Sequence, residues 1–238
     1  MLKSTEHSLD NGPLFGASTA TTDPPRKKDR PPAMKRAPQS QYERLLEVAA
    51  HLFRAKGYAA TSIRDIARAL KMESSSLYHY INSKEELLFK ICTQSLDELM
   101  EKVEPIVLSD LPPVEKLRRF IETHLDVILE DRDRHAVMLF ELKALSPRRR
   151  KVILQLRDRY EELVLRVVEE GQRAGLLRQD LPARYLKLAL LNLLNWSIFW
   201  YRPDGPLDSS AIARLLGEVF LQGVLHVRAT RSSLATAR

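Results

Sequence analysis

The stretch of residues 61–84, TSIRDIARALKMESSSLYHYINSK, limits the folds open to this chain more than any other segment does. Its first part, residues 61–70, carries apolar side chains at helical spacing, so it is expected to form a short amphipathic helix. A connection of three residues follows, and residues 74–80 form a second short helix that is too polar to be a core element. Two short helices joined by a tight turn, with the second one polar, are typical of a helix-turn-helix unit.

The second helix carries side chains that suit contact with double-stranded DNA. Short hydroxyl groups reach base edges and phosphates, and ring polar groups reach phosphate oxygens. The candidate residues are Ser74, Ser75, Ser76, Tyr78, His79 and Tyr80. A helix over residues 41–56 precedes the pair, and Ser83 opens a long helix that is expected to end near Glu104, before a break from Pro105 to Pro113. The sequence therefore predicts a three-helix DNA-binding domain over residues 41–91, connected by a long helix to the rest of the chain.

Residues 41–91 also resemble the DNA-binding domain of TetR-type transcriptional repressors, and the run LYHYINSKEEL over residues 77–87 is the most specific part of the match. The resemblance implies that Thr61 touches phosphate and that Ser74, Ser75 and Ser76 lie against bases. It further implies that Tyr78, Tyr80 and Lys84 hold the DNA backbone.

Three positions depart from the TetR pattern. Lys71 and Ser75 stand where the family usually has glycine, and Glu73 stands where it usually has serine or threonine. Lys71 must therefore accept the geometry of the turn without the conformational freedom of glycine. Glu73 places a negative charge close to the DNA.

Composition favours an all-α protein. The 238 residues are 44% hydrophobic and include only eight glycines, and few runs alternate as strands do. The net charge of +7 is compatible with a polyanionic partner. Cys92 is the only cysteine, so no intrachain disulfide or thiolate-rich metal site is expected, and we predict that Cys92 is buried. No signal peptide or membrane span is visible, so we expect a cytoplasmic protein without cofactor or membrane partner.

The two ends of the chain are expected to lie outside the folded domains. Residues 1–40, rich in proline and basic groups, read as a disordered basic arm that either follows DNA or is simply unstructured. Residues 92–229 form the predicted C-terminal helical domain for ligand binding and dimerisation, and residues 230–238 form a flexible tail.

Several C-terminal residues are candidates for binding a ligand. Arg148, Arg149 and Arg150 open a helix with positive charge, which is either a solvated surface or a site for a phosphate. Tyr160 continues that helix inward. Asn192, Asn195, Trp196 and Phe199 share one helical face, which suits either a ligand cavity or hydrogen bonds at a subunit interface. His124 is expected to be an interior residue rather than a ligand contact.

The expected function is that of a regulator. No P-loop, GxGxxG turn, GxSxG elbow or HExxH zinc site is present, so an enzyme is not expected. The TetR resemblance implies a repressor that binds a palindromic operator as a homodimer through its last two helices and is released by a small hydrophobic effector. The run NLLNWSIFWYRPDGP resembles a subgroup that responds to acyl-CoA thioesters, which implies a long apolar pocket. The alternatives are a TetR-type regulator of efflux or drug response, and a helical DNA-binding protein without effector.

Overall fold

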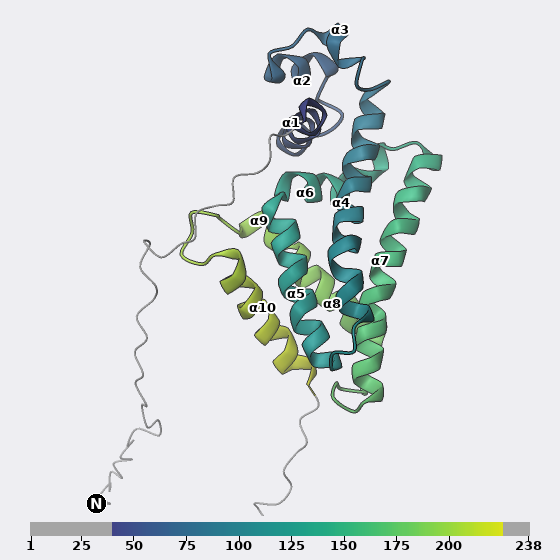
Figure 1. Cartoon of the computed structure of the whole chain (residues 1–238), viewed down its shortest axis with the longest axis vertical. Coiled ribbons are helices and arrows are strands. Elements are labelled where there is room, and N and C mark those ends of the chain that lie inside the picture. The colour runs from purple at the N-terminus through teal and green to yellow at the C-terminus, as the bar shows by residue number, and fades with distance from the viewer. Residues whose placement is uncertain (1–39, 226–238) are drawn as a thin grey trace, which may run out of the picture. The chain divides into compact units, whose positions relative to one another are not determined.

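The computed structural model describes residues 40–225, and the predicted all-α class is confirmed because every element named there is helical (Figure 1). The predicted arm and tail lie outside the described residues, except for Ser40. The chain starts with α1 (Gln41–Lys56), α2 (Ile63–Leu70) and α3 (Ser74–Leu77). Ser40 and Ser62 cap the first two helices, each accepting a backbone N–H three residues ahead at 3.1 Å.

The turn between α2 and α3 has the left-handed geometry that a glycine would normally adopt. Lys71 has φ 56° and ψ 42°, and its N–H and that of Met72 donate to carbonyls at the end of α2. The sequence-based expectation for Lys71 is therefore confirmed. A residue with a Cβ atom pays about 1–2 kcal/mol for this conformation, which the surrounding helices must offset.

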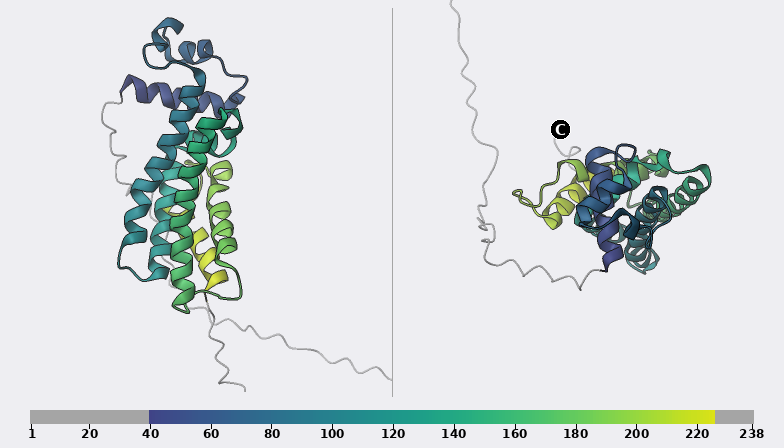
Figure 2. Two further views of the ribbon diagram at one scale, coloured as in Figure 1. Left: turned by 90° about the vertical axis from the view of Figure 1, so that its right-hand side faces the viewer. Right: turned by 90° about the horizontal axis from the view of Figure 1, so that it is seen from above.

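The remaining helices form a bundle in which α4, α5, α7 and α8 run side by side and α10 packs against α5 (Figures 1 and 2). Their bounds are α4 (Lys84–Leu108), α5 (Pro113–Glu130), α6 (Arg132–Phe140), the 3-10 helix η2 (Leu142–Ala144), α7 (Pro147–Arg173), α8 (Ala183–Asn195), α9 (Ser197–Trp200) and α10 (Ser209–Val224). Within residues 40–225, none of the helices has the length and apolar character needed to cross a lipid bilayer.

The long helix α4 continues past the point where the sequence predicts a break. Pro105 lies inside its last turn instead of ending it. Proline removes one helical hydrogen bond, but Val103 and Val107 on either side of it are 0% and 1% exposed. Burial of these two side chains favours one further turn of helix.

The described residues contain two hydrophobic cores. The first includes residues of the N-terminal DNA-binding domain (residues 41–91, called the head below) and extends beyond it. Buried head residues such as Phe53 and Leu88 belong to the same core as Val137 and Met138 of α6 and Ile153 of α7. Cys92 is buried in this core as predicted, and burial raises the pKa of its thiol to about 12. The second core fills the lower bundle between α4, α5, α7, α8 and α10.

Candidate functional site

The helix predicted over residues 74–80 is shorter in the structure, because α3 ends at Leu77 and residues 78–80 form the turn after it. The exposed side of α3 and this turn carries the side chains that the sequence selects for DNA contact. Leu77 is 0% exposed and packs α3 against the hydrophobic core of the head. Tyr78 and Tyr80 are 57% and 38% exposed, and Ser75 and His79 also lie at the surface. Ser74 and Ser76 are half-buried. The polar groups of this short helix and of the turn after it are thus available to a partner.

Thr61 and Lys84 do not share that exposure. The hydroxyl of Thr61, which is 1% exposed, donates to the carbonyls of Gly57 and Leu52 at 2.9 and 3.2 Å. The ammonium of Lys84 donates to the carbonyls of Tyr58 and Thr61 at 2.9 and 2.8 Å and lies 4.2 Å from the centre of the Tyr58 ring. Thr61 thus holds the turn before α2 against the end of α1, and Lys84 joins that turn to the start of α4. The expected phosphate contacts of both residues stay a prediction. Their carbonyl partners lie in their own chain, which sequence spacing does not reveal.

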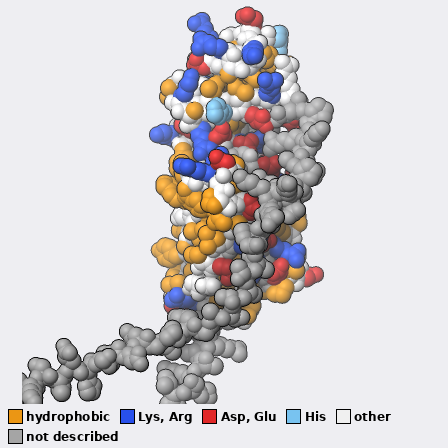
Figure 3. Space-filling view, turned by 90° about the vertical axis from the view of Figure 1, so that its left-hand side faces the viewer, with side chains coloured by type: hydrophobic (Ala, Val, Ile, Leu, Met, Phe, Trp, Pro, Cys, Tyr) orange, Lys and Arg blue, Asp and Glu red, His pale blue; other side chains and the backbone are white. Residues whose placement is uncertain are grey.

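Exposed cations that were not among the candidate residues lie next to α3. Arg64, Arg68 and Lys71 are all exposed, and the Arg68 side chain is 81% exposed. They lie on α2 and its turn, which packs directly against α3. Figure 3 shows Lys and Arg side chains on this end of the molecule. The sequence could have revealed Arg64 and Arg68, because they lie on the polar side of the amphipathic helix predicted over residues 61–70.

A cavity of ≈ 160 Å³ lies between α4, α5, α6, α7 and α8. Its apolar wall consists of Leu96, Leu99, Met138, Leu139, Leu188 and Leu191. Its polar groups are His124, Arg157, Tyr160, Glu161, Asn192 and Asn195. Because His124 and Tyr160 are buried whereas Leu188 and Asn192 are exposed, the closed end lies at His124 and the opening at α8. The cavity is far smaller than the long apolar pocket that the sequence resemblance implies.

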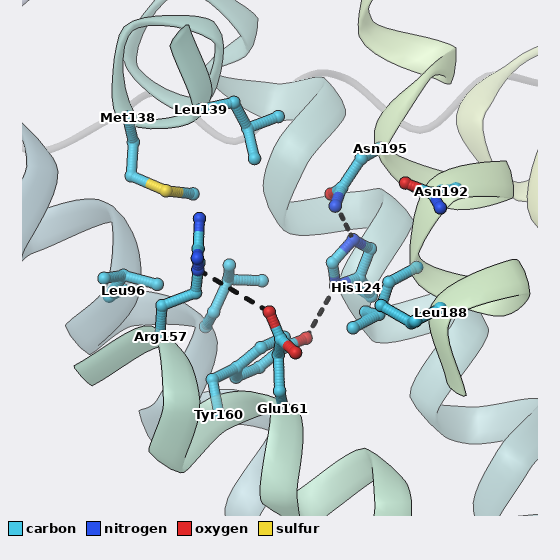
Figure 4. A pocket seen from close by; sticks show the side chains of 12 residues that line it. Leu96, His124, Met138, Leu139, Arg157, Tyr160, Glu161, Leu188, Asn192 and Asn195 are labelled. Carbon is cyan, nitrogen blue, oxygen red and sulfur yellow. Dashed lines mark hydrogen bonds and ion pairs between the residues drawn. The ribbon is translucent and has the colours of Figure 1, made fainter. Parts of the chain in front are cut away.

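A chain of hydrogen bonds closes the inner end of the cavity (Figure 4). His124 Nε2 lies 3.1 Å from Asn195 Oδ1, and His124 Nδ1 lies 2.6 Å from the Tyr160 hydroxyl. Burial lowers the pKa of His124 to about 4, so its ring is neutral at pH 7 and has one N–H. Since the amide oxygen can only accept, Nε2 carries that hydrogen and Nδ1 accepts from the Tyr160 hydroxyl.

Charged groups line the other side of the cavity. Arg157 Nε lies 3.6 Å from Glu161 Oε1, which is an ion pair but not a hydrogen bond. Lys187 donates to the other carboxylate oxygen of Glu161 at 2.8 Å. The Nε–H of Arg157 is buried and has no acceptor among the described residues. No group of three or more potential ligands in residues 40–225 is arranged to hold a metal ion.

The structure brings only some of the predicted ligand residues together. Tyr160, Asn192 and Asn195 line the cavity. Trp196 and Phe199 are 62% and 47% exposed and contact each other outside it with tilted rings, whose centroids are 4.7 Å apart. The shared face ends there because the helix breaks at Trp196, between α8 and α9.

The predicted arginine site is also separate from the cavity, because Arg148, Arg149 and Arg150 lie at the start of α7 beside the head end of α4. There Glu85 accepts the N–H of Ser146 at 2.9 Å and lies 3.5 Å from Arg149, whose guanidinium faces the Phe89 ring. The hydrogen bonds from Ser146, with the nearby Arg149 charge, lower the pKa of Glu85. A carboxylate from α4 thus offsets the positive helix start, which explains a charge pattern that opposes the helix dipole. Arg157, two turns further on, is the cation that lines the cavity.

An exposed apolar surface covers the outer side of α8, α9 and α10. It consists of Tyr185, Leu188, Trp196, Phe199, Trp200, Leu215 and Val219, all at least 43% exposed. Figure 3 shows hydrophobic side chains gathered in the middle of one face of the molecule. A contiguous apolar surface of this kind marks an interaction site.

Direct bonds join the head to α6 and α9. Asp133 accepts from Arg54 at 2.7 Å and lies 2.8 Å from His51 Nδ1, both on α1. Arg54 also donates to the carbonyl of Ile198 in α9 at 3.0 Å. Burial alone would raise the pKa of Asp133, but the hydrogen bonds and charges of His51 and Arg54 lower it. The head is therefore bound to the same helix break that carries Asn195 of the cavity.

Comparisons with known proteins agree with this architecture. Residues 45–91 match the family model for bacterial regulatory proteins of the tetR family, and residues 110–224 match the tetracyclin repressor-like C-terminal domain. The HTH-type transcriptional repressor KstR2 of Rhodococcus jostii (strain RHA1) is 33% identical over 182 residues, which cover 76% of this chain and 89% of that protein.

Solved structures give the same result. The ketosteroid transcriptional regulator KstR2 of Mycobacterium tuberculosis is 28% identical with a TM-score of 0.75, over 80% of this chain and 97% of that one. AibR, solved in complex with isovaleryl coenzyme A and operator DNA, is 28% identical with a TM-score of 0.68, over 76% of this chain and 97% of that one. The chain therefore belongs to the TetR family of bacterial regulatory proteins.

Proposed function

We propose that this protein is a ligand-responsive transcriptional repressor that binds a palindromic operator as a homodimer and is released by an acyl-CoA thioester. The observation that carries the proposal is the path of α4. At its start Lys84 is bonded to the turn before α2, and further along Leu96 and Leu99 line the cavity. A ligand that displaces α4 in the cavity would therefore move the head.

The exposed groups of α3 and of the turn after it support operator binding. Tyr78, Tyr80, His79 and Ser75 are accessible together, and the cations Arg64, Arg68 and Lys71 next to them supply attraction for phosphate. We assign sequence reading to α3 and phosphate attraction to α2 and its turn.

The apolar surface of α8, α9 and α10 supports dimerisation. A twofold axis through these helices would bury the surface against its own copy, as in a four-helix interface. Two heads held at a fixed separation can bind successive major grooves, about 34–36 Å apart, and an effector that changes this separation releases the DNA.

The choice of an acyl-CoA effector rests on the cavity and on a relative. AibR, of the same fold and 28% identical, has been solved with isovaleryl coenzyme A and operator DNA. The cavity of the present chain has an apolar wall, polar groups at its closed end and an opening at α8. It also argues against a DNA-binding protein without effector, because such a protein has no use for an internal cavity with polar groups.

Fluorescence anisotropy on the DNA immediately upstream of the protein's own gene tests the proposal. We expect tight, salt-sensitive binding that a thioester abolishes. Tyr78→Phe should weaken binding, whereas the control variant Arg159→Gln, at an exposed side chain of α7, should not. Binding that no thioester affects would refute the acyl-CoA effector and favour the drug-responsive alternative. Equal affinity for the two variants would contradict the docking of α3.

A further inference from the structure

Arg157 carries positive charge into the cavity without a hydrogen-bonded partner of its own. Its Nε–H is buried and has no acceptor among the described residues. The carboxylate nearest to it, that of Glu161, lies 3.6 Å away and is engaged by Lys187 at 2.8 Å. A buried N–H without an acceptor costs free energy, so a ligand that supplies an oxygen recovers that cost on binding.

The closed end of the cavity also offers a donor. The Tyr160 hydroxyl hydrogen is directed at His124 Nδ1, and Asn195 Oδ1 accepts from His124 Nε2. This leaves the Nδ2 group of Asn195 free to donate. Figure 4 shows Arg157 and Asn195 projecting from different helices towards the space between them. The polar group that fits between two donors is an acceptor, such as a carbonyl or carboxylate oxygen.

The volume of the cavity limits the apolar part of the ligand. An apolar protein cavity of about 150 Å³ holds one benzene molecule. The present cavity has ≈ 160 Å³ and a wall of leucine and methionine side chains. One ring or a short branched chain fits this space, whereas a long acyl chain or a fused ring system exceeds it.

We propose that the cavity selects a compact acyl group, either a short branched chain or a single ring, whose carbonyl or carboxylate oxygen is bound by Arg157 and Asn195. This inference rests on the proposed function and specifies its effector. The planar guanidinium fork of Arg157 suits a carboxylate bidentately and a thioester carbonyl through one N–H. The same chemistry is offered by a free acid and by its CoA thioester. In a thioester, the CoA portion would leave through the open side of the cavity, next to the exposed Asn192.

Isothermal titration calorimetry on the full chain tests this selection. The probes are isovaleryl-CoA, benzoyl-CoA, palmitoyl-CoA, CoA alone, isovalerate and benzoate. We expect the two compact thioesters to bind at least about tenfold more tightly than palmitoyl-CoA, and CoA alone to bind weakly. If the free acids bind as well as the thioesters, the ligand is the acid and the acyl group selection still holds. Tighter binding of palmitoyl-CoA, or no binding of any compact probe, overturns the inference.

Variants on α7 test the role of Arg157. Arg157→Gln should weaken binding of the compact probe roughly ten- to hundredfold, and Arg157→Lys, which keeps the charge but loses the fork, should weaken it less. Arg159→Gln is the matched control, because Arg159 lies on the same helix, is 65% exposed and pairs with Glu104 outside the cavity. Wild-type affinity in Arg157→Gln would refute the assignment.

Operator binding, measured on the same proteins, distinguishes a failure of ligand selection by the cavity from a failure of the proposed release mechanism. A variant that binds operator normally but loses the compact ligand supports the assignment to Arg157 and shows that the variant is folded. Compact ligands that bind wild-type protein without releasing the operator would refute the proposed release mechanism while leaving the selection by the cavity intact.

Discussion

The buried histidine of the cavity predicts a pH-dependent stability. Burial lowers the pKa of His124 from 6.5 to about 4 in the folded protein. Between these pH values the unfolded chain binds a proton that the folded chain excludes, so stability is complete above pH 6.5 and falls as the pH approaches 4. At about 1.4 kcal/mol for each tenfold change in proton affinity, His124 alone accounts for a loss of roughly 3 kcal/mol.

The assay is urea unfolding at fixed protein concentration, followed by circular dichroism over this pH range. His135, whose pKa burial lowers to about 3, adds to the acid sensitivity of the wild type, so the comparison must be made between proteins. His124→Gln removes one titrating group but keeps a donor and an acceptor, and its unfolding free energy should fall less steeply on acidification. His79→Gln, at an exposed position in the turn after α3, is the control. Wild-type and His124→Gln curves that stay parallel would refute the reasoning.

Three further predictions follow from individual contacts. Lys71→Gly should raise the unfolding free energy by about 1 kcal/mol, because glycine relieves the left-handed backbone; unchanged or lower stability in thermal unfolding would argue against strain there. Lys84→Ala should lower the unfolding free energy by about 2 kcal/mol through loss of two charged hydrogen bonds, whereas Tyr78→Phe should leave it unchanged; similar melting curves for both would contradict the structural role of Lys84. Val219→Glu, at a side chain 57% exposed on α10, should convert the dimer to monomer in sedimentation velocity, and a persistent dimer would place the interface elsewhere.

Local features of the sequence were sufficient for the helices and for the head. Helical periodicity and capping serines act within a few residues, so α1 and α2 begin and end close to the expected positions. The left-handed turn at Lys71 was expected from the TetR resemblance, because the family usually has glycine at that position. The predicted end of the long helix near Glu104 was wrong. The helix continues past Pro105 because Val107 is buried against distant segments, and such contacts are not visible in the local sequence.

The candidate site depended on contacts between distant segments, so it was predicted only in part. Asn195 was selected because an amide group stands out in an apolar helix, and Tyr160 because it continues its helix inward. Their partner His124 comes from a third helix. It was predicted to be an interior residue, which the structure confirms, but its hydrogen bonds to Tyr160 and Asn195 were not predicted. The run from Arg148 to Arg150 was selected because its cations are consecutive in the sequence. Arg157 has no adjacent cation and resembles the other scattered charges of its helix. Only the packing of α7 against α8 distinguishes the two.

The short segment from Asn195 to Tyr201 takes part in three separate contacts. Asn195 closes the cavity, the carbonyls of Ile198 and Tyr201 accept from Arg54 of α1 and Arg132 of α6, and Phe199 lies on the exposed apolar surface. One rearrangement of this segment would therefore alter three equilibria together, and thermodynamic linkage requires the effects to be reciprocal. The monomer–dimer constant of this protein should then shift when effector is added and shift back when operator is added.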